Sequence, residues 1–124
     1  MKNYKKEALR TEQYDMEMIK KRLLDEDTIR LLHSAIGLST EANEFLDMLK
    51  KHIYYGKKLD LPNVKEEIGD VFWYTAVAID VLKTTFDEIM SVNIKKLKVR
   101  YPEKFTKENA LNRNLDKERK ILES

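Results

Sequence analysis

Apolar residues recur every three or four positions along most of this chain, which is the spacing of one face of an α-helix. The longest such stretch predicts a helix over residues 28–53. Its apolar stripe consists of Leu31, Ala35, Leu38, Ala42, Phe45, Leu49 and Ile53. Asn63 and Glu66 form a variant capping box that opens the next helix. The stripe of this helix consists of Val64, Ile68, Val71, Thr75, Ala78 and Leu82. We expect the two stripes to face each other in an antiparallel pair.

Capping residues predict the ends of these helices and the start of another. Gly56 suits the C-terminus of the first long helix, and Pro62 suits the entry to the second. Thr85 and Glu88 form a capping box that starts a helix over residues 86–100. The Tyr-Pro pair that follows ends this helix, because the residue before proline is disfavoured in the helical region.

The two ends of the chain are also expected to be helical. Residues 4–24 have loosely helical spacing, and the highly charged tail over residues 103–124 is predicted to form helix against a partner surface. Only three Gly and two Pro occur in 124 residues, which favours long helices over many hairpins. The sequence therefore predicts an all-α fold and a single domain over residues 1–124. Its core, over about residues 4–102, is expected to be a four-helix bundle of long antiparallel helices, followed by the charged helical tail.

Composition excludes several classes of protein. With 42% hydrophobic and 37% charged residues, the chain is predicted to be globular with a densely charged surface. A net charge of +2 argues against duplex nucleic acid as a partner. The absence of Cys excludes disulfides and thiolate metal sites, and it fits a reducing cytoplasm. No apolar run follows the basic start MKNYKK, so we expect neither a signal peptide nor a membrane span.

Two pairs of acidic residues occupy equivalent positions beside the two long stripes. Glu41 and Glu44 lie on the first helix, and Glu67 and Asp70 lie on the second. A step of three residues keeps both carboxylates of a pair on one face, so antiparallel packing would bring the pairs together. Converging carboxylates repel and need a cation, and oxygen-only ligands suit Mg²⁺ or Mn²⁺. Gly69 lies between the second pair and suggests close approach of a neighbour or ligand. The alternative is that both pairs are solvated surface charge.

The helix over residues 86–100 carries a second unusual group. Asn93 falls in the middle of its apolar stripe, and Lys96 and Arg100 lie on nearly the same face. An amide that faces the core must find partners. An Asn, a Lys and an Arg opposite a metal-binding acidic group would suit a polyphosphate substrate. The alternative is a basic helix C-terminus that complements the macrodipole, which explains Lys98 and Arg100 but not Asn93.

Four motifs in order, GLSTEANE, EEIGDVFWY, NIKKLKVRYPEKF and NR, carry a family resemblance. With them the chain resembles the MazG-type nucleoside triphosphate pyrophosphohydrolases of the all-α NTP pyrophosphatase superfamily, in particular its small single-domain members. The resemblance extends from about Leu31 to Arg113. The family signature is E-x-x-E, a spacer, and E-x-x-D, and here 22 residues separate the second and third acids. Asn43 departs from the Gly that many members carry at this position.

The resemblance implies a four-helix bundle that assembles as a homodimer or homotetramer and uses Mg²⁺, with Mn²⁺ as a substitute. It implies hydrolysis of a (d)NTP to the (d)NMP and pyrophosphate. The expected metal ligands are Glu41, Glu44, Glu67 and Asp70. Glu44 and Glu67 are the candidate catalytic residues, with Glu44 either the general base or a ligand. The expected substrate-binding residues are Asn93, Lys96, Arg100 and Tyr74.

Two other interpretations remain open from the sequence. An all-α dUTPase or a phosphoribosyl-ATP pyrophosphohydrolase would share the fold and the acidic residues but cleave a narrower range of substrates. A non-catalytic helical interaction protein would use the acids only as surface charge. In each case Phe72, Trp73 and Val77 give the second long helix more apolar surface than one stripe can bury, which predicts a homo-oligomer.

Overall fold

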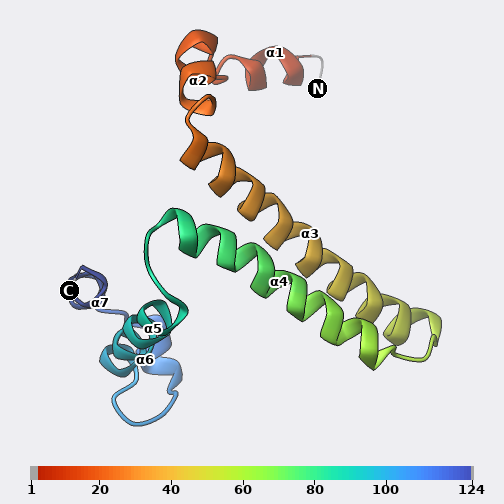
Figure 1. Ribbon diagram of the computed structural model, residues 1–124, viewed down its shortest axis with the longest axis vertical. Coiled ribbons are helices and arrows are strands. Elements are labelled where there is room, and N and C mark those ends of the chain that lie inside the picture. The colour runs from red at the N-terminus through yellow and green to blue at the C-terminus, as the bar shows by residue number, and fades with distance from the viewer. Residues whose placement is uncertain (1–2, 124) are drawn as a thin grey trace. The chain divides into compact units, whose positions relative to one another are not determined.

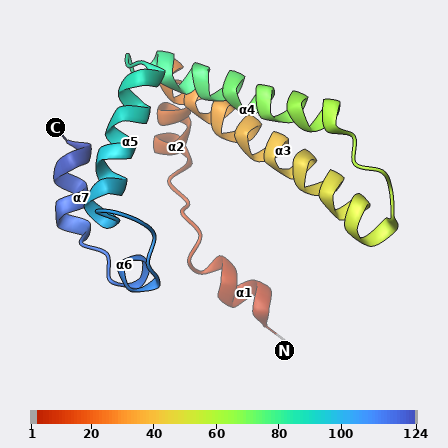
Figure 2. The same cartoon turned by 90° about the horizontal axis from the view of Figure 1, so that it is seen from below.

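The computed structural model describes residues 3–123 and consists of helices joined by short connections (Figures 1 and 2). They are α1 (Tyr4–Leu9), α2 (Met16–Leu23), α3 (Glu26–Tyr55), α4 (Leu61–Val81), α5 (Phe86–Arg100), α6 (Lys107–Leu111) and α7 (Leu115–Leu122). No strand occurs in the part of the chain that the structure describes, so the predicted all-α class is confirmed. The chain divides into two compact units, with the boundary between Val77 and Ala78. None of the described helices is both long and apolar enough to span a membrane.

The first unit is built on an antiparallel pair, α3 and α4, which lie side by side in both views (Figures 1 and 2). Asp25 starts α3 by accepting a hydrogen bond from the backbone N–H of Thr28 at 2.8 Å. Gly56 ends it in the left-handed conformation, with φ of 66°, as predicted. The predicted start of α4 was wrong. Asp60 accepts from the backbone N–H of Asn63 at 3.3 Å, so Asn63 lies inside the helix rather than at its cap.

One close contact holds α3 against α4. The Ser34 hydroxyl, 1% exposed, donates to the backbone carbonyl of Tyr74 at 2.7 Å. One turn further along α3, a Cβ built on Gly37 would lie 2.2 Å from the Tyr74 ring. Only a residue without a side chain fits there. At Gly69 such a Cβ would lie more than 4 Å from every described atom outside its chain neighbours and its own helical backbone, so Gly37, and not Gly69, marks the close approach within the chain.

The predicted stripes of α3 and α4 are only partly covered. Their half-buried members are Leu31, Leu38, Phe45, Leu49, Val64, Val71, Thr75 and Ala78, whereas Ala35, Ala42, Ile53, Ile68 and Leu82 are exposed. Large apolar side chains outside the stripes are exposed as well. They include Ile36 at 55%, Leu46 at 61%, Phe72 at 60% and Trp73 at 55%. A single chain therefore leaves a broad apolar surface on this helix pair.

The N-terminal segment forms two helices rather than the one predicted over residues 4–24. Between these two helices, polar side chains form hydrogen bonds with backbone groups and interrupt the helical hydrogen-bond pattern. Thr11 donates to the carbonyl of Ala8 at 3.0 Å, and Asp15 accepts from the backbone N–H of Met18 at 3.1 Å. Such local bonds compete with helix formation, and they end α1 and cap α2. The second helix, α2, packs on α3.

The second unit pairs α5 with α7. The capping box predicted at Thr85 and Glu88 is present in both directions, and α5 ends at Arg100 as expected. Glu118 of α7 is 3% exposed and accepts from two guanidinium groups. Arg100 donates to it from Nε at 2.9 Å and from Nη2 at 2.5 Å, and Arg113 donates from Nη2 at 2.7 Å. The charged tail is therefore helical, as predicted, and an ion network attaches it to α5.

Candidate active site

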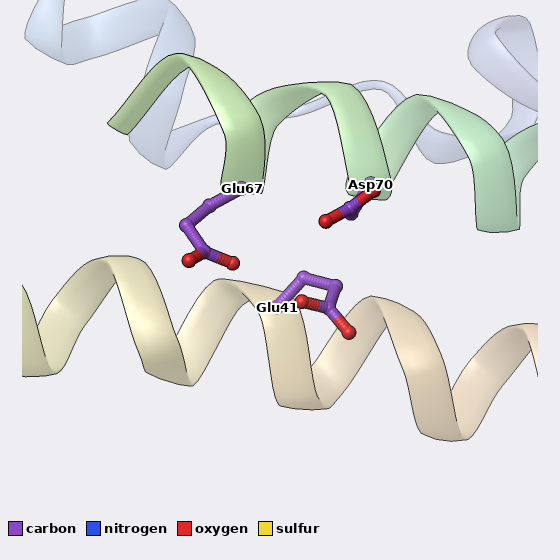
Figure 3. A group of neighbouring side chains, drawn as sticks. All are labelled: Glu41, Glu67 and Asp70. Carbon is purple, nitrogen blue, oxygen red and sulfur yellow. The ribbon is translucent and has the colours of Figure 1, made fainter. Parts of the chain in front are cut away.

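Three of the predicted carboxylates meet between α3 and α4. Glu41 comes from α3, and Glu67 and Asp70 come from α4, where their spacing places both on one helix face. One carboxylate oxygen of each lies within 4.8 Å of those of the other two. Figure 3 shows the side chains of Glu67 and Asp70 directed from α4 towards α3, with the Glu41 side chain lying against α3 below them. The convergence expected from the sequence is present for these three residues.

These carboxylates are not neutralised by a basic side chain. Among residues 3–123, no Lys or Arg forms an ion pair with Glu41, Glu67 or Asp70. Asp47, two turns along α3 from Glu41, is paired with Lys50 at 2.7 Å and with Lys51 at 2.5 Å. Within the described residues no basic side chain offsets the repulsion among these carboxylates, and a bound cation would do so.

Glu67 is the most buried member of the group, at 6% exposed. Burial raises the pKa of its carboxyl group above the ordinary value, and the nearby charges of Glu44 and Glu41 raise it further. A hydrogen bond from Asn63 Nδ2, at 3.0 Å from Glu67 Oε1, acts in the opposite direction. A divalent cation would relieve both the desolvation and the repulsion, and three carboxylates from two rigid helices fit a hard ion such as Mg²⁺.

Glu44, the fourth predicted ligand, lies outside the group of three. Its side chain is exposed, but its charge is close enough to raise the pKa of Glu67. With Glu67 and Asn63 it lines a pocket of about 280 Å³ beside the carboxylates. This position suits a group that exchanges protons with water more readily than a buried ligand does.

Tyr74, predicted to bind substrate, packs its ring against α3 at Gly37. The ring also makes edge-on contacts with His33, at 5.6 Å between centroids, and with Trp73, at 4.8 Å. These contacts account for its half-buried position. A role in substrate binding stays a prediction.

The other predicted substrate-binding residues belong to α5, in the second unit. Asn93 is exposed and borders a pocket of about 440 Å³, so the expectation that its amide faces the core was wrong for this chain. The reason is that α5 leaves its apolar stripe largely uncovered, with Ile89 45% and Met90 53% exposed. Lys96 is half-buried, and Arg100 is engaged by Glu118. Their contacts with phosphate stay predictions.

Two residues of interest were missed in the sequence. Asn63 was interpreted as a helix cap, although its position four residues before Glu67 places both on one face of α4. That spacing was a usable signal. Glu118 lies in a tail rich in both charges, and nothing local distinguishes it from its acidic neighbours.

Two antiparallel helices that bring unpaired carboxylates together define an all-α protein with an acidic candidate site for a cation. A family model, the MazG nucleotide pyrophosphohydrolase domain, matches residues 32–105, which is more than half of the chain. The chain therefore belongs to this family, as its motifs indicated, and the matched region contains all four predicted acidic ligands. The searches of curated proteins and of solved structures gave no match.

Proposed function

We propose that this protein is a Mg²⁺-dependent nucleoside triphosphate pyrophosphohydrolase that converts a (d)NTP to the (d)NMP and pyrophosphate. The observation that carries the proposal is the group of Glu41, Glu67 and Asp70, which lies without basic partners inside the region matched by the family. Nucleotide hydrolysis needs concentrated positive charge around the phosphates, and unpaired carboxylates supply a place to hold it.

In this proposal Glu41, Glu67 and Asp70 hold the metal, and Mn²⁺ can substitute for Mg²⁺. The bound ion supplies Lewis-acid activation of the phosphoryl group and of water. Water attacks the α-phosphorus, the bond from this atom to the bridging oxygen breaks, and pyrophosphate leaves with the bonding electrons. Glu44 accepts the proton from the attacking water, because its carboxylate is exposed beside the metal ligands. Glu67 acts as a ligand whose buried charge is neutralised only by the ion.

Release of pyrophosphate from a panel of ribo- and deoxyribonucleoside triphosphates with Mg²⁺ tests the proposal. Glu67→Gln keeps the size of the side chain but removes the charge. It should lower the rate by at least about 100-fold, the upper end of what the loss of a supporting residue costs at a metal site. Glu66→Gln is the matched control, because Glu66 is adjacent, exposed and outside the acidic group. It should keep most of the activity.

Three outcomes would count against the proposal. An unchanged rate for Glu67→Gln would show that the metal site is wrongly assigned. Activity on dUTP alone would identify an all-α dUTPase, and the absence of pyrophosphate release from every substrate would favour a non-catalytic helical protein.

We also propose that the protein is a homo-oligomer, a dimer or a tetramer. The support is the apolar surface of α3 and α4, where Ile36, Leu46, Phe72 and Trp73 are all more than half exposed. Association would bury these side chains at roughly 25 cal/mol per Å² of apolar surface. Sedimentation at micromolar concentration should therefore give a mass at least twice the 14.7 kDa of the chain. A stable monomer would contradict this proposal.

A further inference from the structure

Asn63 forms a bridge from the acidic group to the opposite helix. Its side chain is half-buried in the first turn of α4, four residues before Glu67. The amide Nδ2 lies 3.0 Å from Glu67 Oε1 and 2.9 Å from the Met48 Sδ atom of α3. The two N–H bonds of a planar amide diverge, so one can serve the carboxylate and the other the sulfur.

The chemistry of this partner distinguishes Glu67 from other well-bonded carboxylates of the chain. Asp47 is bonded to two lysines and Glu118 to two arginines, and in both cases the cationic partners cancel the charge. The amide of Asn63 is neutral. It can therefore fix the orientation of the Glu67 carboxylate and leave its charge, and its second oxygen, for a cation.

An orienting partner is needed at this position for a physical reason. Glu67 has several rotatable bonds and lies beside the like charges of Glu41 and Glu44. Without a donor, repulsion would favour rotamers that turn its carboxylate away from the other ligands. Because Met48 belongs to the helix that carries Glu41, the same amide also links the two helices that supply the ligands.

We propose, on the basis of the proposed metal centre, that Asn63 is a positioning residue for the metal. It holds Glu67 in the ligating orientation and does not itself bind the ion. Loss of the amide should therefore weaken metal binding even when no nucleotide is present.

The test is titration of the nucleotide-free protein with Mn²⁺, with free Mn²⁺ measured by electron paramagnetic resonance. Asn63→Leu keeps the number and branching of the side-chain heavy atoms but removes the amide, and Asn63→Ala is the smaller alternative if the first variant does not fold. Either variant should bind Mn²⁺ about 10-fold or more weakly than the parent protein. Asn43→Ala is the matched control, because Asn43 lines the same pocket but donates to the backbone carbonyl of Ser39 at 2.7 Å. Its affinity should stay within about twofold of the parent value, since no bond to a ligand is lost.

Melting temperatures without metal separate positioning from a purely structural role. A structural tie predicts a lower melting temperature for the Asn63 variants and an unchanged affinity for Mn²⁺, and this result would overturn the proposal. An equal loss of affinity in Asn43→Ala would also overturn it. If the parent protein itself bound no Mn²⁺, the proposed metal centre would be wrong as well. If the parent bound Mn²⁺ and the Asn63 variants bound it equally well, only the role of Asn63 would be wrong.

Discussion

Gly37 offers the sharpest test of how α3 and α4 pack. A methyl group at this position would lie 2.2 Å from two ring atoms of Tyr74, far inside van der Waals contact. The ring has little freedom to move, because it also packs edge-on against His33 and Trp73. Gly37→Ala should therefore destabilise the protein, although Ala is the better helix former.

The magnitude follows from two opposing effects. Ala is favoured over Gly in a helix interior by about 1 kcal/mol. Inserting a group into a packed contact costs typically about 1–3 kcal/mol, and displacing the Tyr74 ring weakens aromatic contacts worth about 0.5–1.5 kcal/mol each. We expect a net loss of about 1–2 kcal/mol in the free energy of unfolding. In a Tyr74→Ala background the obstacle is absent, and the same substitution at Gly37 should stabilise by about 1 kcal/mol.

The assay is urea unfolding followed by circular dichroism, at one protein concentration because association would shift the apparent stability. The predicted result is a change of sign between the two backgrounds, which a double-mutant cycle detects as coupling. Gly69→Ala is the control. Apart from its chain neighbours and its own helical backbone, no described atom lies within 4 Å of its built Cβ, so it should stabilise in both backgrounds. If Gly37→Ala stabilised the protein with Tyr74 in place, the close approach of the helices at Gly37 would be refuted.

Two further predictions concern the second unit. Glu118→Gln should lower the melting temperature at neutral pH by about 5 °C or more, because two guanidinium groups lose a charged acceptor. Those groups lower the pKa of Glu118 from 4.5 to about 2, so its contribution is complete above pH 4.5 and is lost as the pH falls towards 2. Melting curves of both proteins should therefore converge near pH 2, and an equal difference at every pH would contradict this reasoning. Lys96→Ala should lower pyrophosphate release at least 10-fold, roughly the cost of losing one charge contact, while the free energy of unfolding changes by no more than about 0.5 kcal/mol. An unchanged rate would show that Lys96 does not contribute to phosphate binding.

Local patterns in the sequence were sufficient to predict most of the helices. The range 28–53 differs from α3 by two residues at each end, because a long stripe and a terminal Gly specify both period and stop. The capping box at Thr85 gave the start of α5 directly. The prediction of one helix over residues 4–24 was wrong. Weak apolar spacing cannot show whether polar side chains will form hydrogen bonds with the backbone groups and interrupt the helix. At α4, Asp60 and Asn63 were both acceptable caps, and only the folded chain shows which one is used.

The acidic residues show where local reasoning stops. Helical spacing predicted that Glu67 and Asp70 share a face, and the structure places both toward Glu41. The same reasoning placed Glu44 with them, yet it lies outside the group. The difference depends on how α4 sits on α3, and the contact of Ser34 and Gly37 with Tyr74 is one of the contacts that fix this packing. That contact joins positions about forty residues apart and has no local signature.

The charges of the acidic residues also explain why the centre should bind an ion tightly rather than merely tolerate one. The buried carboxylate of Glu118 forms ion pairs with two arginines, Arg100 and Arg113, which compensate its charge. Glu67 is buried almost as deeply as Glu118 and lies beside the like charges of Glu41 and Glu44. Its hydrogen-bond partner is the neutral amide of Asn63. The folded chain without metal therefore carries an unfavourable electrostatic energy that the unfolded chain does not. On the proposed function, a cation that entered the group would remove this energy and bind the folded state selectively, so the same residues that destabilise the free protein would strengthen its hold on the metal.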